Sequence, residues 1–250
     1  MKFKKPKIKF FIMTKEDCLE NMKLFLDYSN LNNCDFTTNN IIDYFKIDKN
    51  ELFREGDNYL KTIIENSHNQ EKLLQTNCEL ELAWNNVENL VLKILGEIFN
   101  VDYEGFDEYK AITGINPVCP RFLKHKSFCL FDCNSSKENI YVIIHELIHF
   151  YWFEFWNTYV YELDDNQKEF PSLEWVLSEL SIDSIITQTK LNQLVENKKP
   201  AYDYFYDIKT DDGYLINYLR QLYINNSLKD FMIKGITYIK ERVKNADLIK

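Results

Sequence analysis

The sequence predicts an α+β protein that is mainly helical. Glycine and proline are scarce, with 6 and 5 copies in 250 residues, which favours long helices over a turn-rich β architecture. Apolar residues recur at spacings of three and four over much of the first hundred residues, as they do on one face of a helix. Apart from the N-terminal segment, short strand-like runs come only after residue 101. Hydrophobic residues make up 45% of the chain and aromatic residues 15%, enough for a sizeable core.

The N-terminal segment predicts a charged first strand or arm. Residues 2–9 contain five lysines, and the apolar run that follows, 10–13, is soon interrupted by charged residues. This run is too short for the apolar part of a signal peptide. We therefore expect a cytoplasmic protein.

The first hundred residues are expected to be mainly helical, and the pattern is helical almost throughout 50–100. Thr14 can cap a helix that reaches about residue 28, and Thr37 or Thr38 can cap another that reaches Phe45. The strongest helical pattern covers 78–99, where large apolar residues recur every three or four positions.

The second half begins with two strands and continues with helices. Residues 109–113 and 127–131 are strand-like and are separated by a turn-rich segment. Ser135 and Glu138 fit the capping box, in which each side chain satisfies the other's backbone N–H, so a helix should follow over 140–156. Further helices are expected over 173–188, 213–223 and 228–243, the first of them opened by Pro171 and Ser172.

Charge and cysteine content exclude several classes of protein. The net charge of −9 argues against a general nucleic-acid binder, which needs basic surface to displace counterions. No stretch is long and apolar enough to span a bilayer. The six cysteines are scattered, so free thiols are expected rather than a disulfide framework. A structural zinc site formed by Cys119, Cys129 and Cys133 is the alternative.

The sequence His145-Glu-Leu-Ile-His149 carries the strongest chemical signal. Histidines at i and i+4 lie on one face of a helix, so both imidazoles can reach one cation. Glu146 points about 100° away round the helix, where it suits a general base better than a ligand. A metal ion acidifies a bound water, and a carboxylate beside it can take the proton.

A third ligand has to come from an acid, a cysteine or a tyrosine, because no histidine follows His149. The expected helix over 173–186 is apolar nearly all round and should be buried, and a buried carboxylate needs a partner. Glu179 and Asp183 meet this condition as ligand and as hydrogen-bond acceptor from a ligating histidine. Glu174 is the competing ligand, and Glu162 and Glu169 are weaker alternatives in or near a loop.

These residues resemble the gluzincin branch of the zincin-like metallopeptidases, whose pattern is HExxH followed by ExxxD on the next helix. The resemblance covers residues 127–187. It implies a zincin-like core, a single zinc ion bound by His145, His149 and Glu179, Glu146 as general base, and Asp183 as support for the first histidine. It also implies a peptide or protein substrate. On this basis residues 1–77 form a helical N-terminal region and residues 78–250 the metallopeptidase domain.

The same resemblance suggests groups around the metal. The strand before the motif helix would be a substrate-binding edge at Phe128, Cys129 and Leu130, although an ordinary core strand fits those residues too. A donor to the oxyanion is also needed, and Tyr214 and Tyr218 share a helical face. The other options are Tyr202, Tyr204, Tyr206, Arg121 and His125.

Three functions are compatible with the sequence. The first is a zinc metallopeptidase that hydrolyses peptide bonds with a metal-activated water. The second is a highly selective regulatory or effector protease that cuts one partner protein. The third is a non-catalytic metal-binding protein with a zincin fold.

Overall fold

The structure is a computed structural model, and it describes residues 1–26, 36–195, 199–244 and 248. The chain forms two compact units that alternate along the sequence. Unit 1 contains residues 1–5, 87–106 and 144–250, and unit 2 contains residues 6–86 and 107–143. The predicted boundary between residues 77 and 78 lies inside a long helix, α5, Gln70–Phe99.

A four-stranded mixed sheet has the order β1-β2-β4-β3. Its strands are β1, Lys2–Ile12; β2, Asp102–Gly114; β3, Arg121–Phe122; and β4, Ser127–Phe131. β4 runs parallel to β2, with Gly114 opposite Phe131, and antiparallel to β3. The lysine-rich segment at the N-terminus is therefore a strand, as predicted. Its alternating exposed lysines suit a strand at the edge of a sheet, because charge there discourages pairing with another chain.

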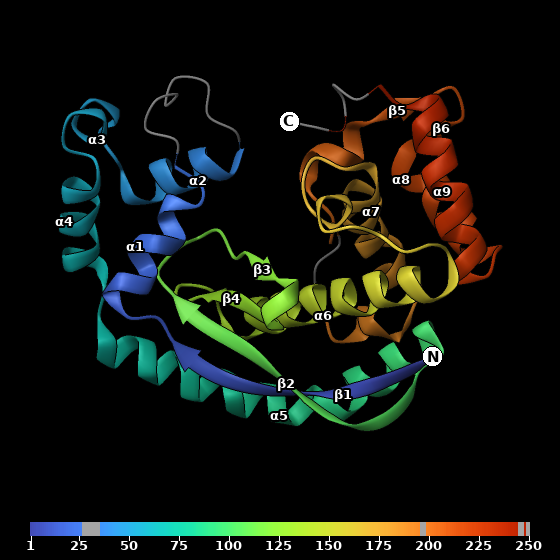
Figure 1. The fold of residues 1–250 in the computed structure, drawn as a ribbon, viewed down its shortest axis with the longest axis horizontal. Helices are drawn as coiled ribbons and strands as arrows, with labels where there is room; N and C mark the ends of the chain where they lie inside the picture. Colours follow the sequence, from blue (N-terminus) through green and yellow to red (C-terminus); the bar gives the residue numbers. More distant parts are fainter. Residues whose placement is uncertain (27–35, 196–198, 245–247, 249–250) are drawn as a thin grey trace. The chain divides into compact units, whose positions relative to one another are not determined.

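Four helices of unit 2 lie between β1 and β2 along the chain (Figure 1). They are α1, Lys15–Lys23; α2, Phe36–Phe45; α3, Lys49–Glu55; and α4, Asp57–Ser67. Thr14 caps α1 as predicted, with its side chain accepting from the backbone of Asp17. α1 ends at Lys23, earlier than expected, and α2 begins at Phe36, ahead of the expected caps.

Unit 1 is built on three helices that pack on one another (Figure 1). These are α7, Leu173–Thr187; α8, Leu215–Ile224; and α9, Leu228–Arg242. In the sequence, α7 and α8 are separated by a segment that contains a two-stranded antiparallel hairpin. Its strands are β5, Lys209–Thr210, and β6, Gly213–Tyr214. The prediction of an α+β protein dominated by helix is confirmed.

The motif helix is α6, Ser136–Tyr159. Its start is the predicted capping box: the backbone N–H of Ser135 donates to Glu138 Oε2 at 2.7 Å, and that of Glu138 donates to Ser135 Oγ at 3.3 Å. The aromatic side chains that follow the motif, from Phe150 to Trp156, are all buried in the core. Glu154, which lies among them in the sequence, is exposed.

Replacing Ser135 by Ala is expected to lower the free energy of unfolding by about 1 kcal/mol, because the first turn of α6 loses its cap. Hydrogen bonds from the side chain and then the backbone of Ser135 lower the pKa of Glu138. A carboxyl with a lowered pKa stabilises the fold above its unfolded-state pKa and loses that effect as the pH falls. Denaturant melts of the wild type and Ser135→Ala should therefore differ most at pH 7 and less in acid, where only the hydrogen bond from the Glu138 N–H to Ser135 Oγ still separates them. Glu138→Gln, which can still accept the hydrogen bonds, should lose less stability.

Candidate metal centre

His145 and His149 lie one turn apart on α6, with their ring planes at 66° and their Nε2 atoms 3.0 Å apart. His149 is fully buried, and its ring stacks on Phe153 one turn later. His145 is less enclosed, with 15% of its side chain exposed. The helix periodicity thus produces the convergence that the sequence predicts, and neighbouring aromatic packing fixes the inner ring.

Glu179 on α7 completes a buried group of three possible ligands. Its Oε2 lies 3.3 Å from His145 Nε2 and its Oε1 lies 3.2 Å from His149 Nε2. Ligand atoms held at about 2.0–2.1 Å around a tetrahedral ion are about 3.3 Å from one another. The two histidine nitrogens and the nearest oxygens of Glu179 are close to this separation. One ligand atom from each of the three side chains lies within 4.8 Å of the others, so this His-His-Glu group could hold a metal ion.

The burial of α7 explains why Glu179 faces the histidines. Every residue from Val176 to Ile186 is buried, as the apolar pattern predicts. The hydroxyls of Ser178 and Ser181 donate to backbone carbonyls of their own helix, so they are satisfied without leaving the core. A carboxylate on such a helix is stabilised only by polar partners.

Glu146 lies beside this group without belonging to it. Its Oε1 is 4.0 Å from His145 Nε2, farther than either oxygen of Glu179 is from its histidine. Its side chain is 6% exposed. A carboxylate placed one step outside the ligand set can exchange a proton with a water bound there.

The structure corrects the expectation for Asp183. Its oxygens accept hydrogen bonds from Arg220 Nε at 2.6 Å, Arg220 Nη2 at 2.8 Å and Tyr206 Oη at 2.7 Å, and not from a histidine. Asp183 is fully buried on α7, while Arg220 comes from α8 and Tyr206 from the single-turn 3-10 helix Asp203–Asp207. The side chain therefore joins three elements one turn beyond Glu179.

Other acids are placed away from the ligand set. Glu174 Oε1 accepts hydrogen bonds from Tyr161 at 2.9 Å and Gln167 at 3.1 Å. Glu162 and Glu169 are exposed. Among the described residues, the group with metal-ligand spacing is His145, His149 and Glu179.

The two favoured tyrosines point elsewhere. The ring of Tyr214 faces the Lys209 ammonium, and that of Tyr218 stacks on Tyr238 with 3.7 Å between centroids. By contrast, burial and then the negative charge of Glu179 raise the pKa of Tyr204 to about 12. Tyr204 therefore stays protonated and lies within the electrostatic reach of the ligand group. The alternatives Arg121 and His125 belong to unit 2.

The expected substrate edge is also corrected. β4 lies between β2 and β3. Phe128 pairs with Arg121, and the N–H of Cys129 donates to Pro120 O at 2.9 Å. Phe128, Cys129 and Leu130 are all buried. Because β4 has backbone partners on both sides at Phe128 and Cys129, those residues cannot pair with an added peptide strand.

The described cysteines are free, as predicted: Cys18, Cys78, Cys119, Cys129 and Cys133. Within this part of the chain they form no group with metal-ligand spacing, so the structural zinc site is not supported. Cys34 lies outside the described residues.

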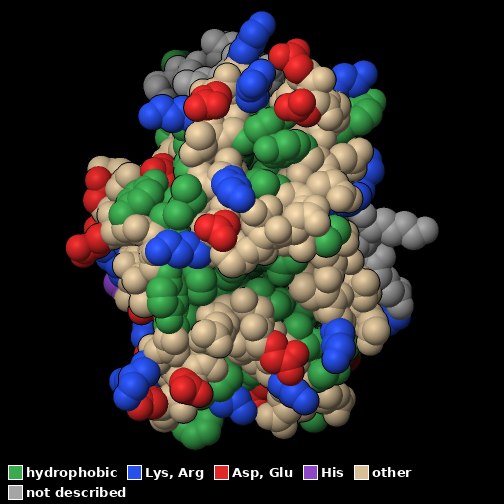
Figure 2. Space-filling view, turned by 90° about the vertical axis from the view of Figure 1, so that its right-hand side faces the viewer, with side chains coloured by type: hydrophobic (Ala, Val, Ile, Leu, Met, Phe, Trp, Pro, Cys, Tyr) green, Lys and Arg blue, Asp and Glu red, His purple; other side chains and the backbone are tan. Residues whose placement is uncertain are grey.

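The hydropathy of the helices and the distribution of charge on the surface limit membrane and nucleic-acid partners. No helix among the described residues is long and apolar enough to cross a membrane. On the face that Figure 2 shows, Lys and Arg side chains lie among Asp and Glu side chains rather than in one group. A nucleic acid would therefore meet no continuous basic surface on that face.

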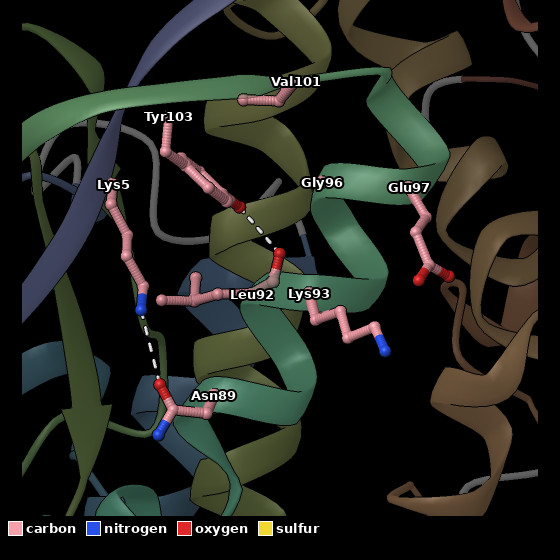
Figure 3. Close-up of a pocket in the computed structure, with 8 residues that line it drawn as sticks. All are labelled: Lys5, Asn89, Leu92, Lys93, Gly96, Glu97, Val101 and Tyr103. Atoms are coloured by element: carbon pink, nitrogen blue, oxygen red, sulfur yellow. Dashed lines mark hydrogen bonds between the residues drawn. The ribbon is translucent and has the colours of Figure 1, made fainter.

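Unit 1 also contains a hollow of about 400 Å³, which is lined by other residues than the ligand group. It lies between Lys5 of β1, α5 and Tyr103 of β2, whose hydroxyl donates to Leu92 O at 2.7 Å (Figure 3). Lys5 Nζ reaches Asn89 Oδ1 at 3.3 Å across the hollow. None of the residues predicted to act in catalysis or metal binding lines it.

Comparison of the chain with protein-family models, curated proteins and solved structures finds no match.

Proposed function

We propose that the protein is a zinc-dependent metallopeptidase with a zincin-like core. The proposal rests on one observation above all: two histidine nitrogens and a buried carboxylate converge within 3.0–3.3 Å, with a second carboxylate beside them. Two imidazoles and one carboxylate are a ligand set of catalytic zinc sites, which keep a fourth position for water. The fit of donor types and spacings supports zinc over oxygen-preferring cations such as Mg²⁺.

Each side chain then has a defined task. A bound zinc ion supplies Lewis-acid chemistry, in which a water is acidified and a carbonyl is polarised. His145, His149 and Glu179 hold the ion, and Glu146 accepts the proton of the attacking water and returns it to the leaving amine nitrogen. Tyr204, kept protonated by its raised pKa, replaces Tyr214 and Tyr218 as the candidate donor to the developing oxyanion.

Zinc binding tests the ligand set directly. Glu179→Ala is expected to weaken Zn²⁺ binding by more than about a hundredfold, because loss of a ligand should exceed the 10–100-fold cost of losing a ligand's partner. Glu174→Ala, an acid on the same helix with other hydrogen-bond partners, should bind as the wild type does. Calorimetric titration of Zn²⁺ into metal-free protein measures both. Equal weakening in the two variants would contradict the assignment of Glu179.

The reaction is tested with the zinc-loaded protein and a chelator-treated control. Metal-dependent cleavage of many peptides in a library supports the peptidase proposed here. Cleavage of a single protein in a lysate would favour the selective protease instead. Stoichiometric zinc with cleavage of neither substrate would favour the non-catalytic alternative.

A further inference from the structure

A second cavity, in unit 2, lies at the carboxyl ends of the parallel strands β2 and β4. Their pairing places Gly114 opposite Phe131, so the residues that follow, Ile115 and Asp132, are also neighbours. Both line a cavity of about 310 Å³. The other residues that line it are Tyr44, Phe45, Ser67 and Lys72. In parallel sheets this end of the strands is the usual place for ligands.

An exposed thiol, Cys133, lies next to this cavity and is surrounded by donors. Its Sγ is 3.1 Å from Tyr44 Oη and 3.3 Å from Lys72 Nζ. It also lies two residues before Ser135, which caps α6. A cation and a helix N-terminus both stabilise a thiolate, which is the nucleophilic form of cysteine.

Both donors keep their protons under ordinary conditions. The hydrogen bond to Asp132, and then the one to Cys133, raise the pKa of Lys72. Burial and then the hydrogen bond to Cys133 raise the pKa of Tyr44. Lys72 is therefore charged and the Tyr44 hydroxyl is able to donate to the sulfur.

Asp132 gives an independent sign of a ligand. Its side chain is only 5% exposed, and its Oδ2 accepts from Lys72 Nζ at 2.6 Å. Its buried Oδ1 accepts no hydrogen bond from any residue in the described part of the chain. A buried carboxylate oxygen without a donor is costly, so a ligand that brings an ammonium group into the cavity would relieve that cost.

We propose that Cys133 reversibly forms a mixed disulfide with a small thiol that carries an ammonium and a carboxylate group, as cysteine does. The Cys133 thiolate attacks one sulfur of a low-molecular-weight disulfide such as cystine, whose S–S bond breaks. A mixed disulfide forms on Cys133, and the other half leaves as a thiolate, so the disulfide is itself the oxidant. The ammonium of the bound half is held by Asp132 Oδ1 and its carboxylate by Lys72.

The protein contains a matched control thiol. Cys78 on α5 is also exposed and free, but no lysine or tyrosine of the described part of the chain forms a hydrogen bond with its sulfur. With cystine under native conditions, intact mass and peptide mapping should show Cys133 modified about tenfold faster than Cys78. Lys72→Met should bring the rate at Cys133 close to the rate at Cys78, and thermal melting would verify that the variant is folded.

A second disulfide reagent separates a binding site from simple thiol reactivity. Hydroxyethyl disulfide lacks both the ammonium and the carboxylate, so its preference for Cys133 over Cys78 should be smaller than that of cystine. Asp132→Asn changes the activation of the thiol equally for both reagents, so it should lower the ratio of the cystine rate to the hydroxyethyl disulfide rate at Cys133. Equal rates at the two cysteines, equal preference for the two reagents, or a disulfide within the chain in place of the adduct would each overturn the proposal.

Discussion

Replacing Glu146 by Gln is expected to lower kcat for peptide hydrolysis by a factor of about 10² to 10⁴, the usual contribution of a general base. Gln has nearly the same shape but cannot accept the proton of the attacking water. Because the lost interaction belongs to the transition state, KM should change little. Zinc binding should also be unchanged, since Glu146 lies outside the ligand set at 4.0 Å from His145 Nε2.

Glu154→Gln is the matched control for this experiment. Glu154 lies on the same helix and is exposed, so its replacement changes the same charge away from the ligand group. Steady-state kinetics and zinc content should match the wild type. Wild-type kcat in Glu146→Gln would refute the role of Glu146, whereas loss of zinc would show that it acts as a ligand instead.

The starts of α1 and α6 and the histidine pair could be predicted because they depend on nearby residues. The capping box at Ser135 joins residues three apart, and the His145–His149 spacing is fixed by a single helical turn. The sequence favours Glu179 as the third ligand over Glu174 by a different route, since a carboxylate on a helix that is apolar all round has to meet polar partners. The structure brings that residue to the two histidines.

The partners of Asp183 could not be predicted in the same way. Arg220 is 37 residues away along the chain, and its position depends on how α8 packs against α7. Local pattern carries no signal for that packing, so a histidine was expected in its place. The strand neighbours of β4 were missed for a related reason, because β3 is only two residues long and has too little pattern to be recognised.

Replacing Arg220 by Met is expected to lower the free energy of unfolding by about 3–5 kcal/mol, the usual cost of leaving a buried charge without its partner. Asp183 is fully buried and takes two of its three hydrogen bonds from Arg220. The third donor, Tyr206, is neutral because burial and then its hydrogen bond to Asp183 raise its pKa. It cannot compensate the carboxylate charge alone.

The chain provides a control for the loss of an arginine. Arg242→Met removes a pair with Asp211 whose atoms are 3.8 Å apart and whose acid is 92% exposed, so its loss should cost less than about 1 kcal/mol. Adding Asp183→Asn to Arg220→Met should restore part of the stability, since it removes the uncompensated charge. Urea denaturation of the four proteins measures these differences. Equal destabilisation by the two arginine variants would show that Asp183 does not depend on Arg220.

If Arg220→Met also weakens zinc binding while the double variant recovers it, then this ion pair holds α7 in the position that presents Glu179 to the histidines.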